Sequence, residues 1–238
     1  MKNTLLCILV LLAAFLPACK KEKDSNPFTN GTVIGNEINY TIVVKNDSVI
    51  LSYHALHENN QFVQDVNIDY FGDTLVKITT INIDTTHAGQ IIKYYLNSHS
   101  YADSAIICST QDSLLSNTHK EYYQYYQDGY LKCFSLQKDS CEGGPLQYLN
   151  GNYNGSDICE YYDYPAKLGI FSRVRRLSND VMGKYDKNLL KRIGSESFYK
   201  SYYYQLDGNG YIVSCIIESN NGGNVGYQKF NYTYQFVQ

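Results

Sequence analysis

Hydrophobic and polar residues alternate along most of this chain, in short runs that are separated by Asn, Asp and Gly. In one example, residues 66–71 lead through a Gly-Asp-Thr turn at 72–74 into a second run at 75–81. Alternation with a period of two predicts half-buried β-strands, and turn residues between two such runs predict a hairpin. The first turns fall near residues 46, 72, 98 and 128. This repetition predicts stacked hairpins in one meander.

One face of these strands carries Tyr, Ile, Val and Leu, and the other carries Thr, Ser, Asn, Lys and Gln. A sheet with one apolar face must cover it, by curling or by packing on another layer. The pattern therefore predicts an all-β fold, an antiparallel meander that forms a curved or barrel-like sheet. A short helix or loop insert is expected near 165–192, where residues 171–182 have helical spacing. The last strand, which alternates strictly to Phe236, is expected to lie within the sheet.

The N-terminus has a different pattern. An apolar run at 5–15 follows Lys2, and it is shorter than the roughly 20 residues that a transmembrane helix needs. It fits a signal peptide, and Leu16-Pro17-Ala18-Cys19 resembles the lipobox of bacterial lipoproteins. The resemblance implies a signal peptide at 1–18, lipid on Cys19, a flexible tether at 19–31 and a single β-rich domain at 32–238. The alternative is ordinary secretion, which leaves Cys19 as a free thiol.

Tyrosine dominates the composition, with 25 Tyr against 9 Phe and no Trp. A tyrosine combines an apolar ring with a hydroxyl that needs a partner, which suits half-buried strand faces. The formal net charge of -3 argues against a nucleic acid as partner.

Five cysteines follow Cys19, so at least one of them has no partner within a monomer. Cys108, Cys133 and Cys215 lie in apolar strand patterns, where cysteine usually acts as a small buried hydrophobe. Cys141 and Cys159 flank a Gly- and Asn-rich stretch, and we expect a disulfide between them in an exported protein.

No catalytic or cofactor-binding motif stands out. His54 and His57 point to opposite faces of a strand, which prevents a shared metal, and neither a Gly-x-Ser-x-Gly nor an HExxH motif occurs. We therefore predict no catalytic residue, metal or cofactor. Eight basic residues form the densest charged group: Lys167, Arg173, Arg175, Arg176, Lys184, Lys187, Lys191 and Arg192. Such a group is most often a solvated face, and an anionic lipid headgroup or acidic glycan is the alternative partner.

Several segments together resemble a family of Bacteroidota outer-membrane lipoproteins of unknown function, whose Tyr-rich hairpins are similar to YD repeats. Besides the lipobox, the segments are Glu160-Tyr161-Tyr162-Asp163-Tyr164, Gly183-Lys184, Lys187-Asn188-Leu189, Asp207-Gly208-Asn209-Gly210-Tyr211 and Tyr232-Thr233-Tyr234. The resemblance implies an antiparallel β-fold in the outer membrane's lipoprotein set, and it brings no catalytic residues.

Five sites also resemble the Bacteroidota O-glycosylation sequon, in which Asp precedes Ser or Thr and then an aliphatic residue or Thr. The candidate acceptors are Ser48, Thr74, Thr85, Ser104 and Ser113. All are expected at solvent-facing turns, where a sugar is tolerated. The alternative is that Asp-Ser and Asp-Thr serve only as turn residues.

These expectations together predict a lipid-anchored protein of the outer membrane, on its periplasmic or cell-surface side. Its function is expected to be non-enzymatic, as a binding or scaffold module for a glycan, a peptide or a protein. The alternative is a hydrolase of cell-surface polymers whose site is assembled from scattered residues. The sequence leaves the ligand, the side of the membrane and the oligomeric state open.

Overall fold

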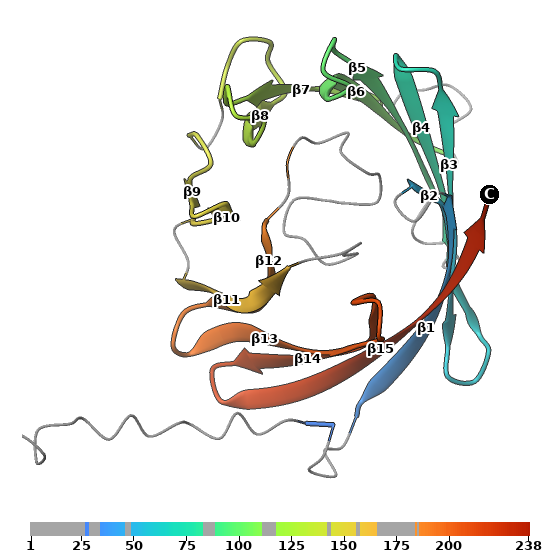
Figure 1. The fold of residues 1–238 in the computed structure, drawn as a ribbon, viewed down its shortest axis with the longest axis vertical. Helices are drawn as coiled ribbons and strands as arrows, with labels where there is room; N and C mark the ends of the chain where they lie inside the picture. The colour runs from blue at the N-terminus through green and yellow to red at the C-terminus, as the bar shows by residue number, and fades with distance from the viewer. Residues whose placement is uncertain are drawn as a thin grey trace, which may run out of the picture. The chain divides into compact units, whose positions relative to one another are not determined.

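A computed structural model of the chain describes residues 27–28, 34–45, 49–82, 89–110, 118–141, 144–155, 158–165, 184 and 186–238. The side chains at 164 and 165 are not described. The chain divides into two compact units, residues 1–31 and 32–238. All of the strands belong to the second unit (Figure 1).

The described part of the second unit is built from β-strands and turns, which confirms the predicted all-β fold. The strands are β1 (Asn36–Lys45), β2 (Val49–His57), β3 (Phe62–Phe71), β4 (Leu75–Asn82), β5 (Gln90–Leu96), β6 (Ala102–Ser109), β7 (His119–Tyr125), β8 (Leu131–Ser135), β9 (Tyr148–Leu149), β10 (Asn152–Tyr153), β11 (Ile158–Pro165), β12 (Asn188–Gly194), β13 (Phe198–Leu206), β14 (Ile212–Asn221) and β15 (Asn224–Val237). Within the described residues, no helix has the length and apolar character needed to cross a membrane.

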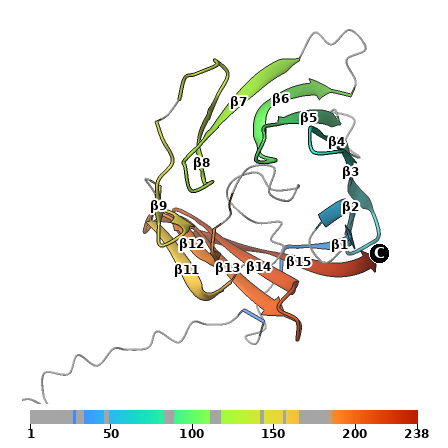
Figure 2. The same cartoon turned by 45° about the horizontal axis from the view of Figure 1, so that its top comes forward.

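Thirteen of these strands form one sheet in the order β11-β12-β13-β14-β15-β1-β2-β3-β4-β5-β6-β7-β8. Consecutive strands pair antiparallel, as the hairpin pattern predicts, and the sheet is strongly bent (Figures 1 and 2). Among the described residues, no ladder joins β8 to β11, so the sheet is curved but not closed. The β9–β10 hairpin forms a separate two-stranded sheet.

The two terminal strands meet in the middle of the sheet. β1 and β15 pair in parallel, with Asn36 opposite Gln228 and Lys45 opposite Val237. The C-terminal strand therefore lies within the sheet as expected, but its neighbour is the N-terminal strand and the pairing is parallel. Because each half of the sheet is a meander of local hairpins, this one long-range ladder joins the halves.

The core lies on one face of the bent sheet, here called the apolar face. At the seam between the halves, Ile38 and Ile42 of β1 and Phe230 and Tyr232 of β15 are buried on this face. The ring of Tyr40 stacks on that of Tyr232, with centroids 5.5 Å apart. Aromatic and aliphatic side chains from both halves of the sheet therefore pack in one core on the apolar face.

Tyrosine hydroxyls stabilise this sheet at three of its β-bulges. Tyr70, Tyr125 and Tyr234 donate to the backbone carbonyls of Ile50, Ala102 and Ile212, at 3.1, 2.9 and 2.9 Å. Each acceptor residue pairs with the residue that directly follows a register shift on the neighbouring strand, where the regular pairing is interrupted. A bulge disrupts its ladder locally, and a buried carbonyl needs a donor. This recurring bond explains why the repeat uses Tyr rather than Phe at these positions.

We expect Tyr234→Phe to lower the free energy of unfolding by about 1–2 kcal/mol, because the buried carbonyl of Ile212 loses its donor. Urea unfolding followed by circular dichroism measures this change. Tyr95→Phe is the matched control, since Tyr95 is 40% exposed and should change stability by less than about 0.5 kcal/mol. Equal stabilities for the Tyr234→Phe variant and the wild type would show that the bond contributes nothing.

The gap between β8 and β11 is crossed by irregular hydrogen bonds. Lys184 N donates to the carbonyl of Gly129 in the β7–β8 turn, at 2.8 Å. Lys187 N donates to the carbonyl of Gly151 at 2.8 Å, and the buried Asp186 accepts from Tyr153 N at 2.6 Å. The segment before β12 is therefore bonded both to the β9–β10 hairpin and to the β7–β8 turn.

The predicted insert differs from the structure at its C-terminal end. Residues 188–192, expected in a helix or loop, form most of β12. Leu189 and Leu190 are both buried, and two successive buried residues hide the alternation by which a strand is recognised. The helix expected over 171–182 lies outside the described residues.

The predicted disulfide is corrected as well. Cys141 is bonded to Cys133 of β8, with their Cα atoms 5.6 Å apart, and not to Cys159. The chain turns back after β8 through Asp139, which has a φ of 63°. Ser140 then lies beside Ser135, with their hydroxyl oxygens 2.6 Å apart. This short turn brings two cysteines together that are eight residues apart in the sequence, while Cys159 lies on β11 opposite Ile193.

Candidate binding surface on the polar face

A row of polar and aromatic side chains crosses the sheet on the face opposite to the apolar face. Arg192 of β12 lies opposite Ser201 of β13, Ser201 lies opposite Glu218 of β14, and Glu218 lies opposite Tyr227 of β15. Alternate residues of a strand point to opposite faces, and residues in register share a face. The buried Cys215 marks the apolar face of β14, so Glu218, three residues along, points to the other side.

Glu218 accepts hydrogen bonds from two tyrosines that flank this row on β13. The hydroxyl of Tyr199 donates to one carboxylate oxygen at 2.9 Å, and that of Tyr203 donates to the other at 3.3 Å. Because the hydroxyl hydrogens point to the carboxylate, the lone pairs of both hydroxyl oxygens are directed to accept further hydrogen bonds.

The protonated forms of Tyr203 and Tyr227 are stabilised by their surroundings. Burial, and then the charge of Glu218 and its hydrogen bond, raise the pKa of Tyr203 to about 12. Burial and the charge of Glu218 also raise the pKa of Tyr227. Near neutral pH, Tyr203 and Tyr227 therefore keep their protons beside Glu218.

Arg192 adds a cation to the cluster. Its guanidinium lies 4.0 Å from the ring centroid of Tyr199, a cation–π contact. Glu160 of β11 is the cross-strand partner of Arg192, but among the described residues the guanidinium forms no ion pair within 4.0 Å. We name the five residues the tyrosine–glutamate surface: Arg192, Tyr199, Tyr203, Glu218 and Tyr227.

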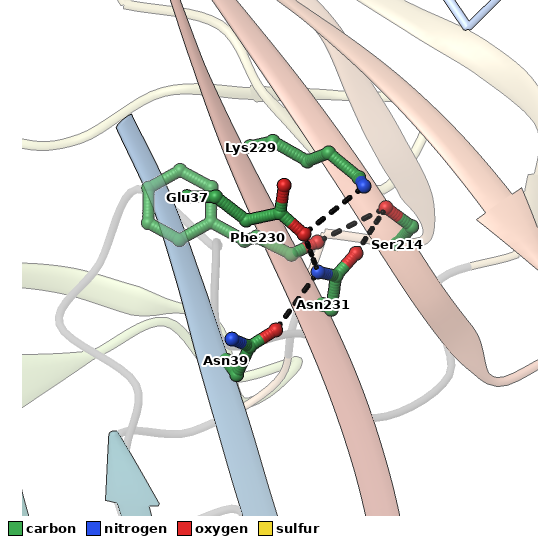
Figure 3. Close-up of polar contacts among 6 residues, drawn as sticks. All are labelled: Glu37, Asn39, Ser214, Lys229, Phe230 and Asn231. Atoms are coloured by element: carbon green, nitrogen blue, oxygen red, sulfur yellow. Dashed lines mark hydrogen bonds and ion pairs between the residues drawn. The ribbon is translucent and has the colours of Figure 1, made fainter. Parts of the chain in front are cut away.

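A second polar cluster adjoins this surface across the parallel seam (Figure 3). Glu37 of β1 accepts from Lys229 Nζ at 3.1 Å and from Asn231 Nδ2. Asn231 Nδ2 also donates to Asn39 at 2.9 Å, and Ser214 Oγ donates to Asn231 Oδ1 at 3.0 Å. The network joins β14, β15 and β1, the three strands at the junction of the two halves.

The charge of Glu37 is stabilised within this network. Burial raises the pKa of its carboxyl group, but the hydrogen bonds from Lys229 and Asn231 and the charge of Lys229 outweigh burial and hold the pKa below its usual range. Glu37 therefore stays ionised, and its charge is balanced by Lys229. The two clusters together offer fixed donors, acceptors and aromatic rings with balanced charge.

Most of the sequence-predicted modification sites lie outside the described residues, namely Cys19, Ser48, Thr85 and Ser113. Thr74 is exposed in the β3–β4 turn, as a glycosylation site requires. Ser104 differs from the expectation of a solvent-facing turn. It lies on β6 between Tyr95 and Tyr122 of the neighbouring strands and is only 5% exposed. A sugar on Ser104 does not fit the folded domain.

The two histidines that sequence reasoning considered have separate partners. His54 Nδ1 pairs with Asp65 of β3, and His57 Nδ1 lies 3.1 Å from Asn36 Oδ1. Among the residues that the structure describes, no three His, Cys, Asp or Glu side chains are arranged to hold a metal ion.

The basic group is only partly described. Lys167, Arg173, Arg175 and Arg176 lie outside the described residues. Lys184 Nζ lies 5.8 Å from the ring centroid of Tyr130. Arg192 belongs to the tyrosine–glutamate surface, where it contacts a ring.

Sequence reasoning missed Glu218 and its tyrosines as a site. The local signal was the alternation of Tyr199, Ser201 and Tyr203 along one run, which places them on one face. Glu218 and Tyr227 lie beside these β13 residues only because of the register of β13, β14 and β15. No short sequence motif predicts that register.

No protein-family model matches this chain, and no curated protein matches it. Among solved structures, the chain is similar to a porin-like protein from Bacteroides uniformis ATCC 8492. The sequence identity is 16% and the TM-score is 0.46, over 76% of this chain and 82% of that chain. This likeness assigns no function to the chain.

Proposed function

We propose that this chain is a lipid-anchored protein of the cell envelope that binds a glycan on its tyrosine–glutamate surface. The observation that carries the binding role is the arrangement around Glu218, where two tyrosine hydroxyls are fixed by one carboxylate. The tyrosine rings offer an apolar platform for the C–H face of a sugar. The tyrosine hydroxyl oxygens can accept hydrogen bonds from the sugar hydroxyls, and the guanidinium of Arg192 can donate to them.

The pairing of the strands favours a glycan over a peptide at this surface. A peptide that binds by β-strand addition needs an open sheet edge. β13, β14 and β15 each have a hydrogen-bonded strand on both sides. A ligand on this face of the sheet must therefore contact side chains rather than the backbone. The interactions that this surface still offers are stacking on tyrosine rings and hydrogen bonding to side-chain oxygens. A sugar makes both kinds of contact.

The hydrogen bonds of the two carboxylates favour binding over hydrolysis. A glycosidase needs one carboxyl group that donates a proton to the leaving group and a second that acts as nucleophile or base. Glu218 accepts from the hydroxyls of Tyr199 and Tyr203, and Glu37 accepts from Lys229 and Asn231. Both carboxylates are therefore engaged with donors of the domain itself.

The envelope location is proposed from the N-terminal residues. Leu16-Pro17-Ala18-Cys19 supports a lipid on Cys19, and the family resemblance with the sequon-like sites supports a Bacteroidota outer membrane. Intact-mass measurement of protein from a native host tests the lipid and the sugars. A Cys19→Ser variant is expected in the soluble fraction, and membrane retention of that variant would contradict the anchor.

The binding role is tested with the full chain on an array of cell-envelope glycans. Tyr203→Ala removes a ring of the platform, and we expect about a tenfold weaker affinity for the bound glycan. Glu218→Gln keeps the size of the side chain but loses the charge that orients the tyrosine hydroxyls, so its affinity should also fall.

Tyr95→Ala is the matched control for these variants. Tyr95 is an exposed tyrosine on the distant strand β5, and its removal should leave the affinity unchanged. Equal affinities of the wild type, Tyr203→Ala and Glu218→Gln, or no glycan bound at all, would show that this surface is not the binding site.

A further inference from the structure

A row of lysines crosses the polar face in the N-terminal half of the sheet, where β4 to β7 lie side by side (Figure 2). Lys77 of β4 lies opposite Lys93 of β5. Lys93 in turn lies opposite Ile106 of β6, and Ile106 lies opposite Lys120 of β7. Alternate residues of a strand point to opposite faces, and Ile92, beside Lys93, is buried in the core on the apolar face. The three lysines therefore point to the polar face, and we call them the lysine row.

The charge of the lysine row is only partly neutralised. Lys77 Nζ lies 3.9 Å from a carboxylate oxygen of Asp69 on β3. Lys93 and Lys120 are exposed, and neither forms an ion pair with another described residue. Like charges that lie directly opposite each other on neighbouring strands destabilise a sheet, and Lys77 and Lys93 are such a pair. An anion bound beside both lysines would offset this repulsion.

Aromatic side chains form a second row beside the lysine row on the same face. Tyr95 of β5 and Tyr122 of β7 each follow a lysine of the row by two residues, a distance of roughly 7 Å along the strand. Both lie opposite Ser104 of β6, one on each side. Phe71 of β3 extends this row beyond Leu75 and is 51% exposed.

The burial of Ser104 indicates how the two tyrosine rings lie. Ser104 points to the polar face but is only 5% exposed, and its direct neighbours on both sides are Tyr95 and Tyr122. We attribute this burial to rings that lean over the short serine side chain. A leaning ring turns one face to the solvent, and Tyr95 is 40% exposed. Lys120 Nζ lies 4.8 Å from the ring centroid of Tyr122, so a cation already adjoins the rings.

The other carboxylates near these rows leave the lysine row positive. Asp73 in the β3–β4 turn and Asp103 at the β5–β6 bulge are exposed, but both lie on the far side of the aromatic row from the lysines. Glu121 shares the apolar face with the buried Ala105. Asp65 lies on the polar face, four residues from Asp69, and pairs with His54. A local cationic row thus stands out in a chain with a formal net charge of -3.

We infer that the lysine row and its tyrosines form a second binding surface, for an acidic polysaccharide. The carboxylates of the ligand pair with the lysines, and the C–H faces of its sugars lie on the rings of Tyr95 and Tyr122. β4 to β7 each have a hydrogen-bonded strand on both sides, so a peptide cannot bind here by strand addition. The inference goes beyond the proposed function and does not depend on it, because the tyrosine–glutamate surface lies on β12 to β15.

Calorimetric titration of the full chain tests this inference with three probes. They are an oligogalacturonate, the same oligosaccharide with its carboxyl groups converted to methyl esters, and an oligoglutamate. We expect the oligogalacturonate to bind at low salt and to bind more weakly as salt screens its carboxylates from the lysines. The methyl ester should not bind measurably, and the oligoglutamate should bind more weakly because it has no sugar face to place on a ring.

Three single substitutions locate the binding site. Lys93→Gln and Lys120→Gln should each weaken oligogalacturonate binding about two- to fivefold, the contribution of an exposed ion pair. Tyr95→Ala should weaken it several-fold through the loss of a ring. Lys200→Gln is the matched control, because it removes an exposed lysine from β13 in the other half of the sheet, and it should leave the affinity unchanged. All of these side chains are exposed, so the variants should fold.

Four results would overturn the inference. They are no binding of the oligogalacturonate at low salt, an equal affinity for its methyl ester, an equal affinity for the oligoglutamate, and an equal loss of affinity in Lys200→Gln and Lys93→Gln. Tyr203→Ala distinguishes the two surfaces, since it should leave oligogalacturonate binding unchanged while it weakens the glycan of the tyrosine–glutamate surface. Loss of oligogalacturonate binding in Tyr203→Ala, with full binding in Tyr95→Ala, would move the acidic ligand to that surface and contradict a second site.

Discussion

Raising the pH from 10 to about 11 or 12 is expected to unfold the domain cooperatively. Burial raises the pKa of five core tyrosines well above the ordinary value of 10; these are Tyr53, Tyr123, Tyr125, Tyr232 and Tyr234. In the unfolded chain the same groups release their protons near pH 10. Below that pH both states keep the protons, so these groups add no pH dependence.

Above pH 10 only the unfolded state releases protons, so the free energy of unfolding falls as the pH rises. Each such tyrosine lowers it by about 1.4 kcal/mol per pH unit, and five lower it by about 7 kcal/mol per pH unit. That slope is of the order of the whole stability of a domain, about 5–15 kcal/mol. Few single-residue changes would affect the fold as strongly.

Absorbance at 295 nm and circular dichroism, recorded together during an alkaline titration, measure this effect. The absorbance change of the buried tyrosines, which follows that of the exposed ones as the pH rises, should coincide with the loss of β-structure. Tyr53→Phe is the informative variant, because it removes one titrating group, and it should make the fall of stability above pH 10 shallower. Full ionisation of all 25 tyrosines with native circular dichroism would contradict burial of these rings.

Removal of residues 228–238 is expected to abolish folding. These residues form the whole of the parallel ladder with β1 and include the buried Phe230 and Tyr232. Loss of two buried aromatic side chains alone costs about 3–5 kcal/mol each, and the two halves of the sheet lose the ladder that joins them. Together these losses exceed the stability of an ordinary domain.

Size-exclusion chromatography and near-ultraviolet circular dichroism test this truncation. Removal of Val237 and Gln238 alone is the control, since both residues are exposed at the end of β15, and the shortened chain should elute and absorb like the wild type. A native near-ultraviolet spectrum from the chain that ends at residue 227 would show that the parallel seam is dispensable.

The local part of the fold was readable from the sequence. The runs predicted at 66–71 and 75–81 match the ends of β3 and β4 at their shared turn, where Gly72 has the positive φ of 58° that favours glycine. Alternation and turn chemistry act over a few residues, so short hairpins leave a clear signal.

The long-range part was not readable. The pairing of Asn36 with Gln228 depends on which two apolar faces meet after the whole chain has curled. The same limit explains why β12 was taken for part of an insert, because its buried Leu189 and Leu190 break the period of two. It also explains the disulfide, since the turn at Asp139 that brings Cys141 to Cys133 lacks glycine, the usual signal of a left-handed turn residue.

The candidate surface combines both cases. The tyrosines of β13 were visible as a run, but their partner Glu218 was hidden within β14. The chemistry of the surface arises from the register of adjacent strands, where a carboxylate fixes two hydroxyls. An isolated tyrosine or glutamate in the sequence carries no such signal.

Glycan binding at this surface is tested most directly by a carbon-13 spectrum of the full chain with labelled tyrosine rings. The chain is titrated with the glycan that binds most tightly on the array, and the rings are assigned by Tyr→Phe variants. The ring signals of Tyr199, Tyr203 and Tyr227 should shift in proportion to saturation, while those of the buried Tyr53 and Tyr232 stay in place. Saturable binding that leaves the three surface rings unshifted would contradict the assignment of this surface.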